Sequence, residues 1–294
     1  MSYIKAFLLL FIICTNAYAE IRQTDDLHII KKEIFASPKD TLVIFDIDYV
    51  LITPSDEIFI MSTTHDGLEI LKNSEDDLLA RLPQHDINDI GSAWALSAPW
   101  HAVTPDTAKI FNEIKSKGYK VLGLTASGTG GFGRIPSQEK WRVDELKSIG
   151  ITFDTYFVNA KPGALDIFIP NISQQYAKAK HACFPAASDG IVFTCKIPKG
   201  DTLGAYLQFA KILPKKIIFI DDRMNNLETV SAYCKKNNIE FIGYEYTAIK
   251  EQAKHLKLNA KRAKLQFRVL ELTRTWLSDK QADLLLATLT NEVG

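Results

Sequence analysis

Three apolar runs, each followed by polar side chains, constrain the fold of this chain most. Residues 41–45, 119–125 and 216–220 are rich in apolar and β-branched residues. Such runs are typical of strands that are buried on both faces of a parallel sheet. Helical patterns with capping and terminating residues lie between them. This alternation predicts an α/β fold, a Rossmann-like parallel sheet with helices on both faces.

The remaining elements follow from the same periodicities. We expect two further strands, one within 151–158 and one at 239–244. The expected helices lie at 28–35, 104–118, 137–149, 201–213 and 225–236, and the tail from 247 to 290 is mostly helical.

The spacing of the elements divides the chain into a core and added segments. The long interval between the first two apolar runs leaves room for a small helical cap. The expected units are an α/β core at 20–54 and 103–246, a helical cap insertion at 55–102, a second insertion at 159–198 and a C-terminal helical extension at 247–294.

The first 19 residues have the pattern of a secretory signal. Lys5 precedes an apolar run from Ala6 to Ile13, and a small residue stands at Ala17 and at Ala19. The run is shorter than the roughly 20 residues that span a bilayer. We therefore expect cleavage after Ala19, no stable membrane span, and a periplasmic or secreted protein.

Signal cleavage leaves three cysteines, Cys183, Cys195 and Cys234. An oxidising compartment permits a disulfide. Cys183 and Cys195 bracket a short polar segment, and we pair these two. Cys234 lies in a helical pattern, where we expect a small buried hydrophobic residue.

Acidic and hydroxyl residues stand at the ends of three predicted strands, and a lysine stands at the start of a predicted helix. Ligands of open α/β sheets bind beyond the carboxyl ends of the strands, so we expect these side chains to meet at one edge. In chain order the candidates are Asp46 and Asp48, Thr125, Lys199, and Asp221 with Asp222.

The order and local sequence of these residues resemble the haloacid dehalogenase (HAD) superfamily of aspartate-nucleophile phosphatases. The residues similar to its four motifs are Ile44–Val50, Leu122–Gly128, Lys199-Gly200 and Ile218–Asp222. The resemblance covers about residues 41–245. Within the superfamily the pattern is similar to a poorly characterised secreted bacterial branch, and more distantly to periplasmic class B acid phosphatases.

The resemblance implies a secreted phosphatase that hydrolyses phosphomonoesters through an aspartyl-phosphate intermediate. Asp46 would be the nucleophile. Asp48 would protonate the leaving oxygen and then activate water. Thr125 and Lys199 would bind and neutralise the phosphoryl oxygens.

The resemblance also implies a magnesium cofactor, since the nucleophilic carboxylate would otherwise repel the substrate. Mg²⁺ prefers oxygen ligands in near-octahedral geometry. Asp46, the backbone carbonyl of Asp48, and Asp222 with help from Asp221 would supply them. The metal would act as template and charge neutraliser.

The charge balance narrows the partner class. Lys+Arg and Asp+Glu both number 35, so the formal net charge is zero. This balance argues against a polyanion-binding surface. We expect a small phosphorylated substrate and no nucleic acid polymer as the partner.

Two other functions stay open. Tyr49 stands in the first motif where many phosphatases carry Gly, Asp or Glu. With the unusual tail, it supports a secreted binding or host-interaction protein that keeps the fold and metal site but has negligible turnover. A phosphotransferase or mutase is the other alternative.

The cap insertion carries aromatic residues and histidines. One hypothesis is a lid that contacts the leaving group; the one we favour makes the tryptophans the core of the cap and the histidines surface residues. The residues concerned are Trp94, Trp100, His65, His85 and His101.

Overall fold

The computed structural model describes most of the 294-residue chain. The residues described are 19–63, 69, 73, 77, 80–178 and 183–291. The expected signal segment up to residue 18, His65 and most of the stretch at 64–79 lie outside them.

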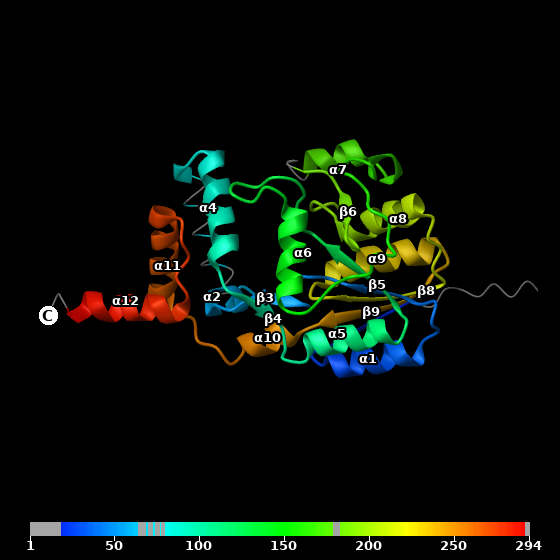
Figure 1. The fold of residues 1–294 in the computed structure, drawn as a ribbon, viewed down its shortest axis with the longest axis horizontal. Helices are drawn as coiled ribbons and strands as arrows, with labels where there is room; N and C mark the ends of the chain where they lie inside the picture. Colours follow the sequence, from blue (N-terminus) through cyan, green and yellow to red (C-terminus); the bar gives the residue numbers. More distant parts are fainter. Residues whose placement is uncertain are drawn as a thin grey trace, which may run out of the picture.

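A seven-stranded sheet lies at the centre of the described part of the chain (Figure 1). Its order is β1-β9-β8-β2-β5-β7-β6, and neighbouring strands are parallel except for β6 and β7. The strands are β1 (Ala19–Thr24), β2 (Leu42–Phe45), β5 (Lys120–Thr125), β6 (Ala186–Ser188), β7 (Ile191–Phe193), β8 (Lys216–Asp221) and β9 (Glu240–Tyr246). The predicted Rossmann-like α/β class is confirmed.

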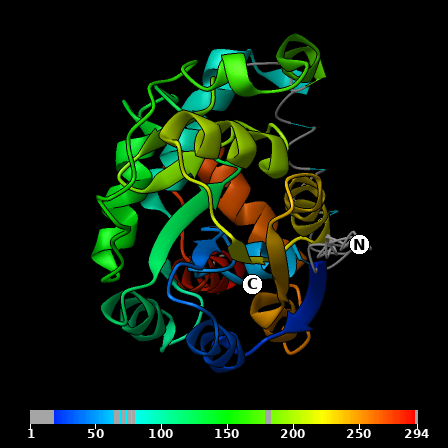
Figure 2. The same cartoon turned by 90° about the vertical axis from the view of Figure 1, so that its right-hand side faces the viewer.

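Helices cover both faces of this sheet (Figure 2). Strand β2 shows why, because its side chains alternate between two apolar clusters. Val43 and Phe45 pack on the side of α1 and α5, whereas Leu42 and Ile44 pack on the side of α8 and α9. The helices of the core are α1 (Leu27–Ala36), α5 (Thr107–Ser116), α6 (Gln138–Ser148), α8 (Lys199–Ala210) and α9 (Met224–Lys236). The continuous apolar run of β2 thus reflects burial on both faces.

The cap insertion and the C-terminal extension pack together at one end of the molecule (Figure 1). The cap contributes α2 (Glu57–Met61), α4 (Gln84–Ser97) and β4 (Trp100–Ala102), which pairs antiparallel with β3 (Ile52–Pro54) at the end of the first core segment. The extension contributes α10 (Ala248–Ala253), α11 (Ala260–Thr273) and α12 (Asp279–Asn291). Phe59 of α2 contacts the rings of Trp94 and Trp276, with centroids 4.8 and 5.0 Å apart. Of the cap histidines that are described, His85 is exposed and His101 is half-buried.

Two expectations about the middle of the chain are wrong. Residues 151–158 form turns and irregular backbone, and β7 takes the place beside β5. Ile151 and Phe153 are buried, so their apolar pattern reflects packing without strand pairing. The expected second insertion at 159–198 contributes β6 and β7 to the sheet, together with η1 (Asp166–Phe168) and α7 (Ile172–Lys178).

The cysteine pairing is confirmed. A disulfide joins Cys183 to Cys195, and Cys234 is a free, buried thiol. Burial raises the pKa of this thiol to about 12, which keeps it protonated and unreactive.

No helix in the described ranges has both the length and the apolar composition to cross a membrane.

Candidate metal centre

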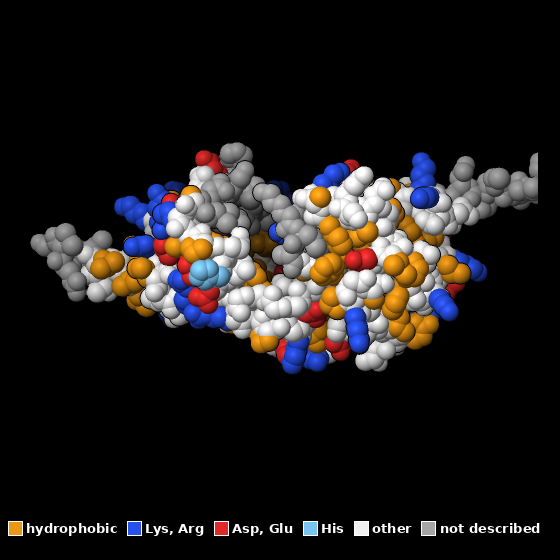
Figure 3. Space-filling view, turned by 90° about the horizontal axis from the view of Figure 1, so that it is seen from above, with side chains coloured by type: hydrophobic (Ala, Val, Ile, Leu, Met, Phe, Trp, Pro, Cys, Tyr) orange, Lys and Arg blue, Asp and Glu red, His pale blue; other side chains and the backbone are white. Residues whose placement is uncertain are grey.

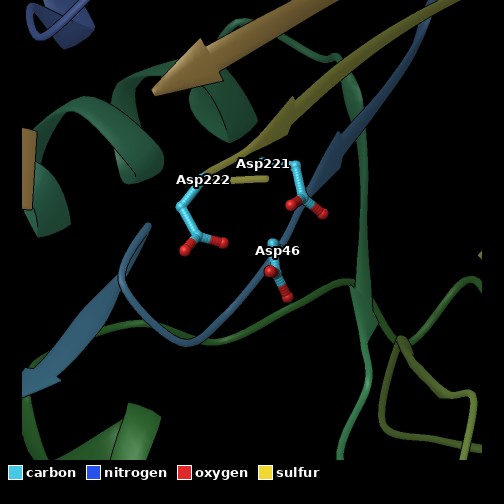
Figure 4. Close-up of side chains that lie close together, drawn as sticks. All are labelled: Asp46, Asp221 and Asp222. Atoms are coloured by element: carbon cyan, nitrogen blue, oxygen red, sulfur yellow. The ribbon is translucent and has the colours of Figure 1, made fainter. Parts of the chain in front are cut away.

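The site lies at the carboxyl ends of three adjacent strands, β8, β2 and β5. Asp46 directly follows β2, and Asp221 and Asp222 end and follow β8. One carboxylate oxygen from each of the three lies within 4.8 Å of the others, and the three side chains point toward one another (Figure 4). The chain leaves β2 toward β5 on one side and returns through β8 on the other, so this edge is the topological switch point.

Lys199 neutralises part of this cluster. Its Nζ lies 2.8 Å from Asp46 Oδ1 and 2.6 Å from Asp221 Oδ2, and its side chain is fully buried. It is the first residue of α8. A Cβ at Gly200 would lie 2.1 Å from the Thr229 carbonyl oxygen. Glycine therefore lets the start of α8 approach α9 closely enough to present the lysine.

Asp221 and Asp222 have different surroundings. Both oxygens of Asp221 are engaged: Oδ1 accepts from the Arg223 backbone N–H and from Asn226 Nδ2, each at 2.9 Å, and Oδ2 accepts from Lys199. Asp222 has a longer ion pair, 3.8 Å to Arg223 Nε. Asp46 and Asp222 are therefore the carboxylates with most capacity left for a cation.

The acid–base properties of the cluster show a shortage of positive charge. Burial raises the pKa of Asp46 well above its ordinary value, and Asp221 and Asp222 raise it further against the opposing effect of Lys199. Burial, with Asp221 next, raises the pKa of Asp222 to about 7. Burial lowers the pKa of Lys199, but Asp221 and Asp46 more than reverse this, so its ammonium persists. If all three carboxyls ionise, they carry two negative charges more than the one ammonium neutralises, and a divalent cation would balance them.

Asp48 and Thr125 meet through Ser127 rather than through the carboxylate cluster. Thr125 Oγ1 donates to Ser127 Oγ at 3.0 Å and accepts from the Ser127 N–H at 3.2 Å. Ser127 Oγ in turn donates to Asp48 Oδ2 at 3.5 Å. Of the four predicted metal residues, the structure therefore brings together the carboxylates of Asp46, Asp221 and Asp222. The side chain of Asp48 lies apart from them. This agrees with the resemblance, which implies that only the backbone carbonyl of Asp48 is a ligand.

Arg142 is a site residue that the sequence did not indicate. It lies on α6 with 4% of its surface exposed, and its Nη2 forms a 2.9 Å ion pair with Asp48 Oδ1. Its Nη1 pairs with Glu145 Oε2 at 2.9 Å. The guanidinium lies 5.0 Å from the ring of Trp100 and 4.4 Å from that of Trp141. The only signal in the sequence is a basic residue in a helix after a glycine-rich loop, which is too common to be informative.

Tyr49 has a strained backbone beside the site. Its φ is 63°, in the left-handed region that a residue with a side chain rarely adopts. Its hydroxyl lies 3.4 Å from the Phe59 carbonyl, to which it donates, and 3.3 Å from Ser62 Oγ. Such strain clusters at functional sites. Here the strained residue connects the turn after β2 to the cap through its hydroxyl.

Fold and site together define a Rossmann-like α/β protein with a buried carboxylate centre that could hold a metal ion. The chain belongs to the family described as "Protein of unknown function (DUF2608)", whose model matches residues 23–283.

Relatives of the chain occur in two bacterial genera, Rickettsia and Chlamydia. An uncharacterized protein of Rickettsia prowazekii is 29% identical over 217 residues, 71% of this chain and 70% of the relative. One of Rickettsia conorii is 27% identical over 256 residues, 82% and 81% of the two chains. A Chlamydia trachomatis protein named "Putative outer membrane protein" is 32% identical over 83 residues, 27% and 32% of the two chains. No solved structure matches the chain at a significant level.

Proposed function

We propose that this protein is a secreted, Mg²⁺-dependent phosphatase of the HAD superfamily that hydrolyses small phosphomonoesters. One observation carries the proposal: Asp46, Asp221 and Asp222 converge at the carboxyl edge of a parallel sheet around the buried Lys199. A carboxylate nucleophile, carboxylate ligands for a cation and a fixed ammonium are what phosphoryl transfer through an enzyme aspartate needs.

The donor set fits magnesium. Oxygen-only carboxylate clusters suit hard cations, and no imidazole or thiolate contributes to the described cluster. Asp46, Asp222 and the Asp48 carbonyl would hold the ion, with Asp221 fixed behind them by Lys199 and Asn226. When bound, Mg²⁺ supplies charge neutralisation for the nucleophile and the phosphoryl group.

The side chains then divide the reaction into two steps. A carboxylate oxygen of Asp46 attacks phosphorus, the bond from phosphorus to the ester oxygen breaks, and Asp48, which enters this step protonated, gives its proton to the departing oxygen. In the second step Asp48 takes a proton from water, the water oxygen attacks phosphorus, and the bond from phosphorus to the Asp46 oxygen breaks. Inorganic phosphate leaves and the Asp46 carboxylate is restored. Lys199 and Thr125 stabilise the charge on the phosphoryl oxygens in both steps.

The test is phosphate release by the purified protein from a panel of phosphomonoesters, with Mg²⁺ and with a chelator. We expect turnover that the chelator abolishes and that Asp46→Asn reduces by at least about 10³-fold, because the nucleophile is lost. Asp40→Asn is the matched control, since this exposed carboxylate lies at the opposite end of β2. It should keep wild-type activity.

The same panel separates the alternatives. Full activity in Asp46→Asn, or activity that the chelator leaves unchanged, would contradict the proposed mechanism. Transfer to an added alcohol faster than to water would identify a phosphotransferase. Absence of metal-dependent turnover on every substrate would favour a binding protein that keeps the fold.

Secretion is the second half of the proposal. It is supported by the predicted signal, by the disulfide between Cys183 and Cys195, and by the name of the chlamydial relative. The predicted cleavage after Ala19 would remove the first residue of β1 and leave the rest of that edge strand.

A further inference from the structure

A cavity of about 410 Å³ opens beside the Asp48 carboxylate. Residues of the cap and of the core both line it, and the surface is hollowed between these two parts, with hydrophobic side chains in the hollow (Figure 3). Its size falls in the range of pockets that enclose small molecules.

Aromatic side chains are five of the fifteen residues that line this cavity. The aromatic lining residues are Tyr49, Trp94, Trp100, Phe132 and Trp141. The ring centroids of Trp94 and Trp100 are 5.6 Å apart in a tilted arrangement, and those of Trp100 and Trp141 are 6.1 Å apart, edge to face. All five side chains are half-buried, so parts of their surfaces stay open to a ligand. The expectation that the tryptophans serve only the core of the cap does not account for this open aromatic wall.

The wall also carries donors without acceptors. Trp94 Nε1 and Arg142 Nε are both buried, and neither has a hydrogen-bond partner in the described structure. Buried donors are rarely left unpaired, and each costs free energy until a partner accepts from it. Both residues line the cavity. Unpaired donors are expected in the wall of a site that binds a ligand with acceptor atoms at its edge, or an ordered water.

Asp48 fixes which part of a substrate would enter the cavity. On the proposed function, its carboxylate protonates the ester oxygen that leaves phosphorus, so the group attached to that oxygen lies on the Asp48 side of the site. The cavity is the space on that side. Arg142 connects the Asp48 carboxylate to the aromatic wall, because it pairs with Asp48 and lies against Trp100 and Trp141.

We infer that the substrate's leaving group carries a planar aromatic ring. The tryptophan-lined cavity binds this ring with its face or its edge against the indole rings. This inference rests on the proposed function. Aromatic pairs prefer tilted and offset arrangements and gain more than the burial of equal aliphatic area. A saturated ring of the same size would fill the cavity without that gain.

Two substrates of matched chemistry test the inference. Benzyl phosphate and cyclohexylmethyl phosphate release alcohols of similar acidity and size, but only the first is aromatic. We expect kcat/KM to favour benzyl phosphate by about 3- to 10-fold, the range of a favourable aromatic contact. Trp100→Leu should abolish this preference and Trp100→Phe should keep it. Tyr156→Leu is the control, since it removes an exposed aromatic residue outside the cavity.

A binding measurement keeps the two proposals distinguishable. Calorimetric titration of Asp46→Asn protein with each phosphate, in Mg²⁺, reports the cavity without turnover. Equal turnover of both phosphates overturns the inference and leaves the phosphatase proposal intact. Preferential binding of benzyl phosphate with no turnover by the wild type overturns the phosphatase and supports the cavity. If the protein shows neither turnover nor binding of these phosphates, both proposals are overturned. If Trp100→Leu does not fold, Trp141→Leu replaces it, and the wild-type ratio alone is already decisive.

Discussion

At the scale of single residues, the buried lysine is the centre of the electrostatics. Lys199 lies between Asp46 and Asp221 with no access to solvent. Removing one partner from a buried ion pair leaves the other charges uncompensated, which costs more than the pair itself contributes. The lysine therefore stabilises the fold as well as the proposed reaction.

Lys199→Met should lower the free energy of unfolding by about 3–5 kcal/mol in the presence of a chelator. Mg²⁺ should restore part of the loss, because a bound cation replaces the missing charge. Urea denaturation with and without Mg²⁺ measures both effects. The exposed Lys236 on α9 provides the control Lys236→Met, which should change little. An equally small change in Lys199→Met would show that the three carboxylates do not depend on the ammonium.

At the scale of elements, a buried carboxylate fastens the cap to the C-terminal extension. Asp56 precedes α2 and accepts from Trp276 Nε1 and from the Asp279 backbone N–H, both at 2.7 Å. Arg262 of α11 adds ion pairs to Glu57 and Asp279. The contacts explain why the tail, which the sequence shows only as helical, belongs structurally to the cap.

The pH dependence of the free energy of unfolding should reveal the buried carboxyl of Asp56 at this junction. Burial raises the pKa of Asp56 above its ordinary value of 3.8, despite its hydrogen bonds. The folded state therefore holds this proton when the unfolded state has lost it, and the free energy of unfolding falls as the pH rises from about 3.8 to the folded pKa. Asp56→Asn removes this contribution while keeping an acceptor for Trp276. Urea denaturation over this pH window should give a flatter profile for the variant, and identical slopes would contradict the assignment.

A second element-scale feature is the disulfide segment beside the site. Backbone N–H groups of Thr194, Cys195 and Lys196 donate to carbonyls of Thr125, Ser127 and Ala126 at 2.9–3.3 Å. The segment that carries Cys195 therefore holds the loop that positions Thr125.

Loss of the disulfide should destabilise the fold. Cys183→Ser should lower the free energy of unfolding by about 3 kcal/mol, because a loop of this length gains entropy when it is opened in the unfolded state. Reductant should produce the same loss in the wild type and none in the variant. A reductant effect of equal size in Cys183→Ser would place the redox sensitivity elsewhere.

At the scale of the whole molecule, the sequence predicts the middle of the sheet better than its edges. Strands β2, β5 and β8 are buried on both faces and therefore appear as apolar runs. The edge strand β1 is only partly buried and mixes polar with apolar residues, so its composition resembles a lead-in. The hairpin of β6 and β7 has one clear signal, the Asp189-Gly190 turn with both φ angles positive, a pair that favours two-residue hairpins.

The candidate site divides in the same way. Asp46, Asp221 and Asp222 are predictable because the carboxyl ends of adjacent parallel strands must meet, and Lys199 because it opens a helix at the same edge of the sheet. Arg142 and the aromatic wall depend on how the cap and α6 pack against that edge. No local pattern specifies such packing, so these residues emerge only from the three-dimensional structure.

The central claim is that Asp46 carries the phosphoryl group during turnover. Its most direct test is to quench the wild-type protein with acid during hydrolysis in Mg²⁺ and to locate phosphate on its peptides by mass spectrometry. The account predicts a hydroxylamine-sensitive phosphoryl group on Asp46, present in Asp40→Asn and absent in Asp46→Asn. Phosphate release with no label on Asp46, or with the label on another residue, would contradict it.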